Sequence, residues 1–158
     1  MKQIRSHDYF MNQAIKQAQK AYEAEEVPVG AVVVDTHGAI IARGYNQVEK
    51  KQSQTAHAEL LAIEKATKKL HNWRLSDCWL YVTLEPCSMC FALACLSRVK
   101  GIVFGAPSPL FGYRLDKKDT GRLYKRGTCE IEVVSGIQAN KAASLLKAFF
   151  KGKRMRSE

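Results

Sequence analysis

One histidine, two cysteines and a glutamate stand in two short segments whose spacing suits metal chemistry. Residues 55–59 read Thr-Ala-His-Ala-Glu, and residues 85–90 read Glu-Pro-Cys-Ser-Met-Cys. Cysteines three residues apart at the start of a helix can direct both sulfurs to one point. The free backbone N–H groups and the positive dipole end at that point favour thiolate over thiol. We therefore take His57, Cys87 and Cys90 as candidate ligands of one metal ion.

The donor set of these ligands indicates zinc in a catalytic site. Two thiolates and one neutral imidazole leave the fourth tetrahedral position open to water, and bound zinc lowers the pKa of such a water to about 7. We expect one Zn²⁺ per subunit. The alternative is a structural zinc closed by a fourth cysteine, drawn from Cys78, Cys95 or Cys129. A closed site would give Glu59 no role, and we expect those three cysteines in the core.

Glu59 follows His57 by two residues, and side chains at that spacing do not share a face in the interior of a helix. At the first helical turn the two side chains can still lie on either side of a metal-bound water. Glu59 would then take a proton from the water, deliver it to a ring nitrogen beside the attacked carbon, and later protonate the departing amine. The sequence thus predicts hydrolytic deamination with Glu59 as the catalytic residue.

Apolar periodicity predicts the elements that must position this site. A hairpin is expected at the first two strands, and a long polar loop before the last strand. Helices are predicted over 6–26, from 55–57 to about 70, over 88–97 and over 138–154; strands are predicted over 29–34, 39–45, 79–84, 101–105 and 129–134. This order favours an α/β sandwich with a mixed sheet covered on both faces. No Gly-x-Gly-x-x-Gly turn follows a strand, which disfavours a dinucleotide enzyme.

Length and composition are those of one ordinary domain. The chain has 158 residues, 46% of them hydrophobic, enough for a single core without disulfides. No apolar run approaches the roughly 20 residues that cross a bilayer, and the N-terminus lacks an apolar signal core. We expect a cytoplasmic protein with no membrane partner, in which five cysteines indicate metal or redox chemistry instead of disulfides.

The formal charge of +10 is concentrated in two stretches, residues 111–126 and 141–158. Each stretch holds six basic side chains, against two acidic ones in the first and one in the second. A solubilising surface would explain one such run. Two basic runs in a chain with a candidate base-processing site favour a nucleic-acid partner.

His-x-Glu followed by Pro-Cys-x-x-Cys is the signature of zinc nucleobase deaminases. Four segments resemble the bacterial tRNA-specific adenosine deaminases in order and separation, and the similarity spans about residues 6–106. These segments are residues 27–32, 44–46, 55–59 and 80–90. The resemblance implies a three-layer α/β/α sandwich with a central mixed five-stranded sheet, of the cytidine deaminase-like fold. It also implies one CMP/dCMP-type deaminase domain over residues 1–158, ending in a basic helix.

By the same resemblance the substrate is the wobble adenosine, position 34, of an arginine tRNA, converted to inosine. Asn46 would hydrogen-bond the flipped base or its sugar, and the Ala58 backbone would hold the base. Phe149, Phe150 and Arg154 would contact the anticodon loop. Without the resemblance Asn46 is interpreted as a turn residue, and at least one of the two adjacent phenylalanines is expected in the core. The family also implies a homodimer, whose interface the 88–97 helix could supply.

The chain departs from this family after residue 106. The family carries an acidic residue and a Lys-Thr-Gly-Ala-like run in a loop that touches nucleic acid, whereas residues 107–113 here read Pro-Ser-Pro-Leu-Phe-Gly-Tyr. Contacts to nucleotides that flank the target, and the choice of substrate, are thereby left open. Two other functions stay as alternatives: a deaminase of free cytosine, guanine or nucleosides, and a non-catalytic, zinc-stabilised RNA-binding module.

Overall fold

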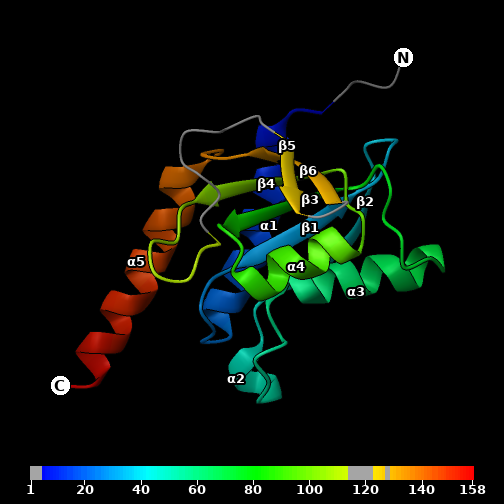
Figure 1. The fold of residues 1–158 in the computed structure, drawn as a ribbon. Coiled ribbons are helices and arrows are strands. Elements are labelled where there is room, and N and C mark those ends of the chain that lie inside the picture. The colour runs from blue at the N-terminus through cyan, green and yellow to red at the C-terminus, as the bar shows by residue number, and fades with distance from the viewer. Residues whose placement is uncertain (1–4, 114–122, 127–128) are drawn as a thin grey trace.

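Helices cover both faces of one mixed β-sheet in a computed structural model that describes residues 5–113, 123–126 and 129–158 (Figure 1). The helices are α1 (His7–Glu23), α2 (Val48–Lys51), α3 (Ala58–Leu70), α4 (Ser88–Leu96) and α5 (Ala139–Arg156). The strands are β1 (Gly30–Val34), β2 (Ile40–Tyr45), β3 (Trp79–Leu84), β4 (Gly101–Ala106), β5 (Leu123–Arg126) and β6 (Cys129–Val134). The predicted α/β class with a covered sheet is confirmed.

The sheet has six strands where five were expected, in the order β2-β1-β3-β4-β6-β5. β1 pairs antiparallel with β2 and β3, whereas β3, β4 and β6 run parallel to one another. The extra strand, β5, lies in the stretch predicted as a polar loop and pairs antiparallel with β6 at the sheet edge. Its sequence, Leu-Tyr-Lys-Arg, lacks the apolar alternation on which strand prediction depends.

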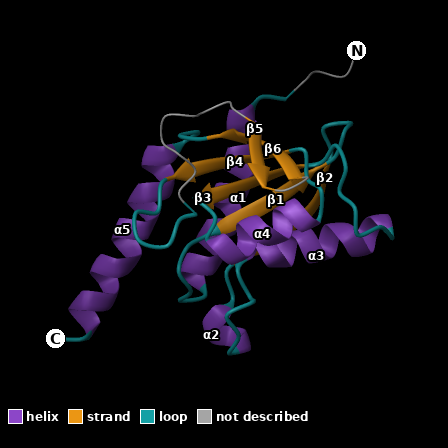
Figure 2. Ribbon diagram, viewed as in Figure 1, coloured by secondary structure: helices purple, strands orange, loops and turns teal. Residues whose placement is uncertain are grey.

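Alternate residues of the central strands supply two separate cores. On β1, Ala31 and Val33 belong to a cluster with α3 and α4, while Val32 and Val34 belong to a cluster with α1. Successive strand side chains point to opposite faces, so a strand buried on both faces must be apolar throughout. This explains the unbroken apolar run of β1 and gives the three layers visible in Figure 2.

The carboxyl ends of β2, β3, β4 and β6 all point to the same edge of the sheet. β2 runs in the direction of β3 because both are antiparallel to β1, and β3, β4 and β6 are parallel. The segments that follow these strands therefore gather at this edge. They hold Asn46 after β2, Cys87 after β3, residues 107–113 after β4 and the start of α5 after β6.

Buried Glu26 explains two differences from the predicted helices. α1 ends at Glu23, not residue 26, and Glu25 takes a positive φ of 60° that turns the chain inward. The carboxylate of Glu26 accepts hydrogen bonds from the backbone N–H groups of Glu49 (3.1 Å) and Lys50 (2.7 Å). These bonds stabilise the start of α2, a four-residue helix that periodicity did not predict.

Among the residues that the structure describes, no helix combines the length and apolarity needed to cross a membrane.

Candidate metal centre and active site

Two helices begin at a predicted metal ligand. His57 is the N-cap residue of α3 and Cys87 is the N-cap residue of α4, each with an extended backbone. Cys90 lies in the first turn of α4 and is fully buried. Because His57 precedes the helix and Glu59 is inside its first turn, the two-residue spacing no longer separates their side chains by helical geometry.

The three ligand atoms lie close enough to hold one metal ion. His57 Nδ1 is 3.7 Å from Cys87 Sγ and 3.5 Å from Cys90 Sγ. Zinc bonds of about 2.3 Å to sulfur and 2.0–2.1 Å to nitrogen in a tetrahedron put these atoms about 3.6 Å apart. Donor types and spacing both fit zinc, and the nitrogen that faces the sulfurs is Nδ1.

Within the described residues this group of candidate ligands has three members, His57, Cys87 and Cys90. Cys78 and Cys95 are 3% and 5% exposed and belong to the α3/α4 core cluster, as predicted. Neither closes the site as a fourth ligand. The side chain of Cys129 lies outside the described part. The arrangement favours a site with an open position over a closed structural one.

The contact between the two sulfurs shifts their pKa values in opposite directions. Hydrogen bonds from Cys90 and His57 lower the pKa of Cys87 to about 4. The pKa of Cys90 is raised, first by its hydrogen bond to Cys87 and then by burial. The bond to Cys87 raises the pKa of His57 as well. Binding a cation here therefore has to displace protons from the ligands.

Glu59 lies beside the ligand cluster without being part of it. Its carboxyl is 4% exposed, and Oε2 accepts a hydrogen bond of 3.5 Å from Cys90 Sγ. Burial raises the pKa of Glu59, against the smaller opposing effects of a backbone hydrogen bond and of His57. A carboxyl that is poised to hold a proton next to a metal site has the properties of a general acid and base.

Asn46, which follows β2, and Ala58, which follows His57, have different surroundings. Asn46 is 7% exposed, and its side-chain N–H donates to the Val27 carbonyl at 3.3 Å, which is the turn-shaping role that the residues alone suggested. Ala58 is fully buried as the first residue of α3. Their contacts with a base stay predictions.

The two phenylalanines of α5 face different ways. Phe149 is 7% exposed and packs edge-on against Tyr22 at 6.1 Å, whereas Phe150 is 44% exposed. One of the pair is thus in the core, as expected. Arg154 is exposed on the same helix. Phe150 and Arg154 are available to a partner as they stand, while Phe149 joins α5 to α1.

Sequence reasoning missed how residues 107–113 are held next to the metal ligands. Gly112 forms an antiparallel bridge with Cys87, and the Tyr113 N–H donates to the Pro86 carbonyl at 2.8 Å. The Tyr113 ring stacks on Phe91 of α4 at 4.4 Å, nearly parallel. The only signal in the sequence was a glycine between two aromatic residues.

Comparison with known families decides the interpretation of this site. The model of the "Cytidine and deoxycytidylate deaminase zinc-binding region" matches residues 4–106, which include all three ligands and Glu59. The chain belongs to this deaminase family. Family membership identifies the metal as zinc and agrees with the donor spacing of His57, Cys87 and Cys90.

Within the deaminase family, the similarity extends over nearly the whole chain. The tRNA-specific adenosine deaminase of Bacillus subtilis (strain 168) is 44% identical over 96% of this chain and 92% of its own length. A solved structure from a study of A-to-I editing by tRNA:A34 deaminases has a TM-score of 0.77 and 37% identity, covering 87% of this chain and 99% of that one. The resemblance found in the motifs is confirmed.

A guanine deaminase also shares the fold. The structure of the enzyme from Nitrosomonas europaea has a TM-score of 0.76 and 26% identity, covering 90% of this chain and 83% of that one. The fold is thus shared by deaminases of different substrates, and the substrate of this protein has to be inferred from other parts of the molecule.

Proposed function

We propose that this protein is a zinc-dependent hydrolase that converts adenosine to inosine at the wobble position of a tRNA. The observation that carries the proposal is the buried Glu59 carboxyl beside a three-ligand zinc site, in a chain 44% identical to a tRNA-specific adenosine deaminase. The choice of an arginine tRNA is supported by the family resemblance alone.

The chemistry divides between the metal and Glu59. Zinc, when bound by His57, Cys87 and Cys90, supplies a water whose pKa is lowered to about 7. Glu59 takes a proton from this water and gives it to the ring nitrogen next to the attacked carbon. The oxygen of that water would bond to the carbon, and Glu59 would then move its remaining proton to the exocyclic amine, so that the C–N bond breaks, ammonia leaves and a carbonyl remains. Burial supports this role because it lets the Glu59 carboxyl hold a proton between the two transfers.

The substrate assignment is supported by charge and by an exposed aromatic ring. Lys147, Lys151 and Arg154 are exposed on α5, and Phe150 is exposed on the same helix. An unpaired base in an RNA loop is turned out into a pocket at modest cost, while basic residues hold the backbone and aromatic rings stack on neighbouring bases. We assign Asn46 and the Ala58 backbone to the target nucleotide, and Phe150 and Arg154 to the anticodon loop.

The test is inosine formation in tRNA by the zinc-loaded wild type and by Glu59→Gln. We expect conversion of one adenosine by the wild type and a loss of rate of about 10²-fold or more in Glu59→Gln, with zinc content unchanged. Inosine is detected as adenosine sequenced as guanosine. A wild type that makes no inosine would leave the RNA-binding module, and an active Glu59→Gln would remove the proposed proton carrier.

A deaminase of free bases is the second candidate, because the guanine deaminase of Nitrosomonas europaea has the same fold. Such an enzyme has little use for a terminal helix with six basic residues. Ammonia release from free guanine, cytosine and adenosine, measured beside release from tRNA, separates the two functions. A higher kcat/KM for a free base than for tRNA would favour the second candidate.

We also propose a homodimer formed through α3 and α4. A groove of about 570 Å³ lies between these helices, and its rim includes Trp73 and Leu96, which are 53% and 68% exposed. A second copy of the chain would cover this apolar surface. Light scattering should give twice the monomer mass for the wild type and the monomer mass for Leu96→Asp.

We propose the cytoplasm as the compartment. Free thiols support this assignment, because Cys78, Cys87 and Cys90 form no disulfide, and thiolate metal ligands persist in reducing conditions.

A further inference from the structure

Two adjacent apolar side chains at the active-site edge are almost fully exposed. Leu110 is 86% exposed and Phe111 is 77% exposed, the highest values for large hydrophobic residues in the described part of the chain. They lie in residues 107–113, the segment that departs from the family pattern. An exposed apolar pair of this kind usually marks a contact surface.

The loop that carries this pair is closed on itself and attached to the metal-binding segment. The Gly112 N–H donates to the Ser108 carbonyl at 2.9 Å, which closes the loop around Leu110 and Phe111. The Ser108 N–H donates in turn to the buried Glu85 carboxylate at 3.2 Å. The contacts of Gly112 with Cys87 and of Tyr113 with Pro86 complete the attachment. The backbone on both sides of Leu110 and Phe111 is therefore attached to the segment that holds Cys87.

Gly112 shows how tight this attachment is. A Cβ atom at position 112 would lie 2.5 Å from the Glu85 carboxyl carbon and 2.5 Å from the Ser108 carbonyl oxygen. Only glycine lets the loop lie flat against Glu85. The sequence thus holds the loop closely against the strand end while leaving its two largest side chains in solvent.

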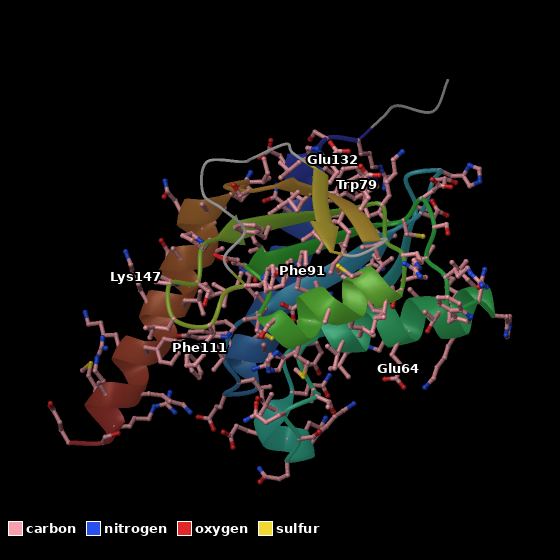
Figure 3. All side chains as sticks on the ribbon, viewed as in Figure 1. Glu64, Trp79, Phe91, Phe111, Glu132 and Lys147 are labelled. Atoms are coloured by element: carbon pink, nitrogen blue, oxygen red, sulfur yellow. The ribbon has the colours of Figure 1, made fainter. Side chains whose placement is uncertain are left out.

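In the view of Figure 3, Phe111 lies between α5 and α4, while Lys147 projects from the other side of α5. The start of α4 is the metal-binding segment, and α5 carries the exposed basic residues Lys147, Lys151 and Arg154. An aromatic ring between a reaction centre and a basic helix matches the surface of proteins that bind unpaired nucleotides.

We propose that Phe111, supported by Leu110, is a stacking platform for an unpaired base next to the target nucleotide in the RNA. This inference rests on the proposed function and names a specificity-determining contact for it. RNA is favoured over a protein partner because the neighbouring helix is basic, which suits phosphates. Stacking needs no base-edge hydrogen bonds, so this contact selects for an unpaired neighbour more than for its identity.

The test compares Phe111→Ala with Phe111→Trp in the full-length, zinc-loaded protein on a tRNA anticodon stem-loop. Loss of one stacked base predicts that KM rises about 5- to 100-fold in Phe111→Ala, with kcat changed less. Phe111→Trp should stay within about threefold of the wild type because a larger ring keeps the stack. Leu70→Ala is the matched control: Leu70 is 42% exposed at the far end of α3 and should have no effect.

A binding measurement keeps this inference separate from the proposed function. Stem-loops with 2-aminopurine at each unpaired position next to the target adenosine report stacking by fluorescence quenching without any turnover. We expect one position whose quenching on binding is lost in Phe111→Ala and kept in Phe111→Trp. Equal quenching and equal KM in wild type and Phe111→Ala would overturn the inference, as would a change of oligomeric state in Phe111→Ala at unchanged RNA affinity. A wild type that quenches but makes no inosine would reject the proposed function and retain the stacking contact.

Discussion

At the scale of single residues, His57 and Cys87 occupy helix positions where a capping side chain usually lies. Neither side chain makes a capping hydrogen bond, whereas Ser6 accepts one from Tyr9 N–H at the start of α1. Both ligand side chains instead face the metal position, 3.7 Å apart. Zinc thus joins the beginnings of α3 and α4, which are otherwise held by backbone bonds and core packing.

Removal of zinc should therefore loosen the first turns of these two helices. The N–H groups of Leu61 and Phe91 donate to the carbonyls of His57 and Cys87 at 3.1 and 2.9 Å. If zinc stabilises each helix start as much as a capping side chain does, its removal costs about 0.5–2 kcal/mol, which corresponds to amide exchange faster by roughly 2- to 30-fold. Hydrogen exchange with mass spectrometry, before and after chelation, measures this.

The start of α1 is the internal control, since Ser6 caps it without metal. Exchange in α1 should not change on chelation, and added zinc should restore protection in α3 and α4. Unchanged exchange at Leu61 and Phe91 in the zinc-free protein would contradict the proposed link between the metal and the helix starts.

At the scale of elements, the position of His57 and Glu59 depends on how closely α3 lies against β2. A Cβ atom on Gly44 of β2 would lie 2.5 Å from the Ala58 carbonyl oxygen and 2.9 Å from the Ala62 nitrogen. Both are backbone atoms of α3, which cannot move aside singly. Gly44→Ala should therefore push the start of α3 away from the sheet and shift Glu59 relative to the zinc ligands.

We expect Gly44→Ala to lower kcat on the RNA by about 10²-fold, since a displacement of about 1 Å of a catalytic group has costs of that order. The free energy of unfolding should fall by about 1–3 kcal/mol. Gly152→Ala on α5 is the matched control, because a Cβ there meets nothing within 4 Å. Wild-type kcat and stability in Gly44→Ala would show that α3 adapts without moving the site.

The elements also show which features the sequence allowed us to predict. β1 and β4 match their predicted ranges to within one residue because strands buried on both faces give an unbroken apolar run. α2 was missed because its residues, Val-Glu-Lys-Lys, have no apolar face, and its start depends on Glu26, more than 20 residues away. Short elements stabilised by tertiary contacts leave no local pattern.

The same distinction applies to the site. The ligand set follows from spacing at two helix starts, and this is a local property of the chain. The use of His57 Nδ1, the inward ring of Phe149 and the attachment of residues 107–113 to Glu85 depend on elements that meet only in the folded sheet. These three features could not be predicted from the sequence because no periodicity encodes which strand ends lie together.

At the scale of the whole molecule, the net charge of +10 is the feature that should control encounter with RNA. The first basic run, residues 111–126, falls largely outside the described residues, whereas the second lies on α5. Arg156 is already paired with Glu25 at 2.5 Å. Lys147, Lys151 and Arg154 are exposed basic side chains on the same helix. These three are our candidates for phosphate contacts.

Replacement of Lys147, Lys151 and Arg154 by alanine should make RNA binding weaker and less sensitive to salt. Each lost phosphate contact reduces the slope of log K against log salt by about 0.7–0.9, so the slope should become shallower by about 2 to 3. Fluorescence anisotropy of a labelled stem-loop, measured between roughly 50 and 200 mM salt, gives the slopes for the wild type and the variant. The control replaces Lys65, Lys68 and Lys69, exposed on α3, which lowers the net charge equally. A larger reduction of the slope in the α5 variant than in the α3 variant would identify α5 as the phosphate-binding element. An equal reduction in both triple variants would show that RNA binding depends on total charge and not on α5.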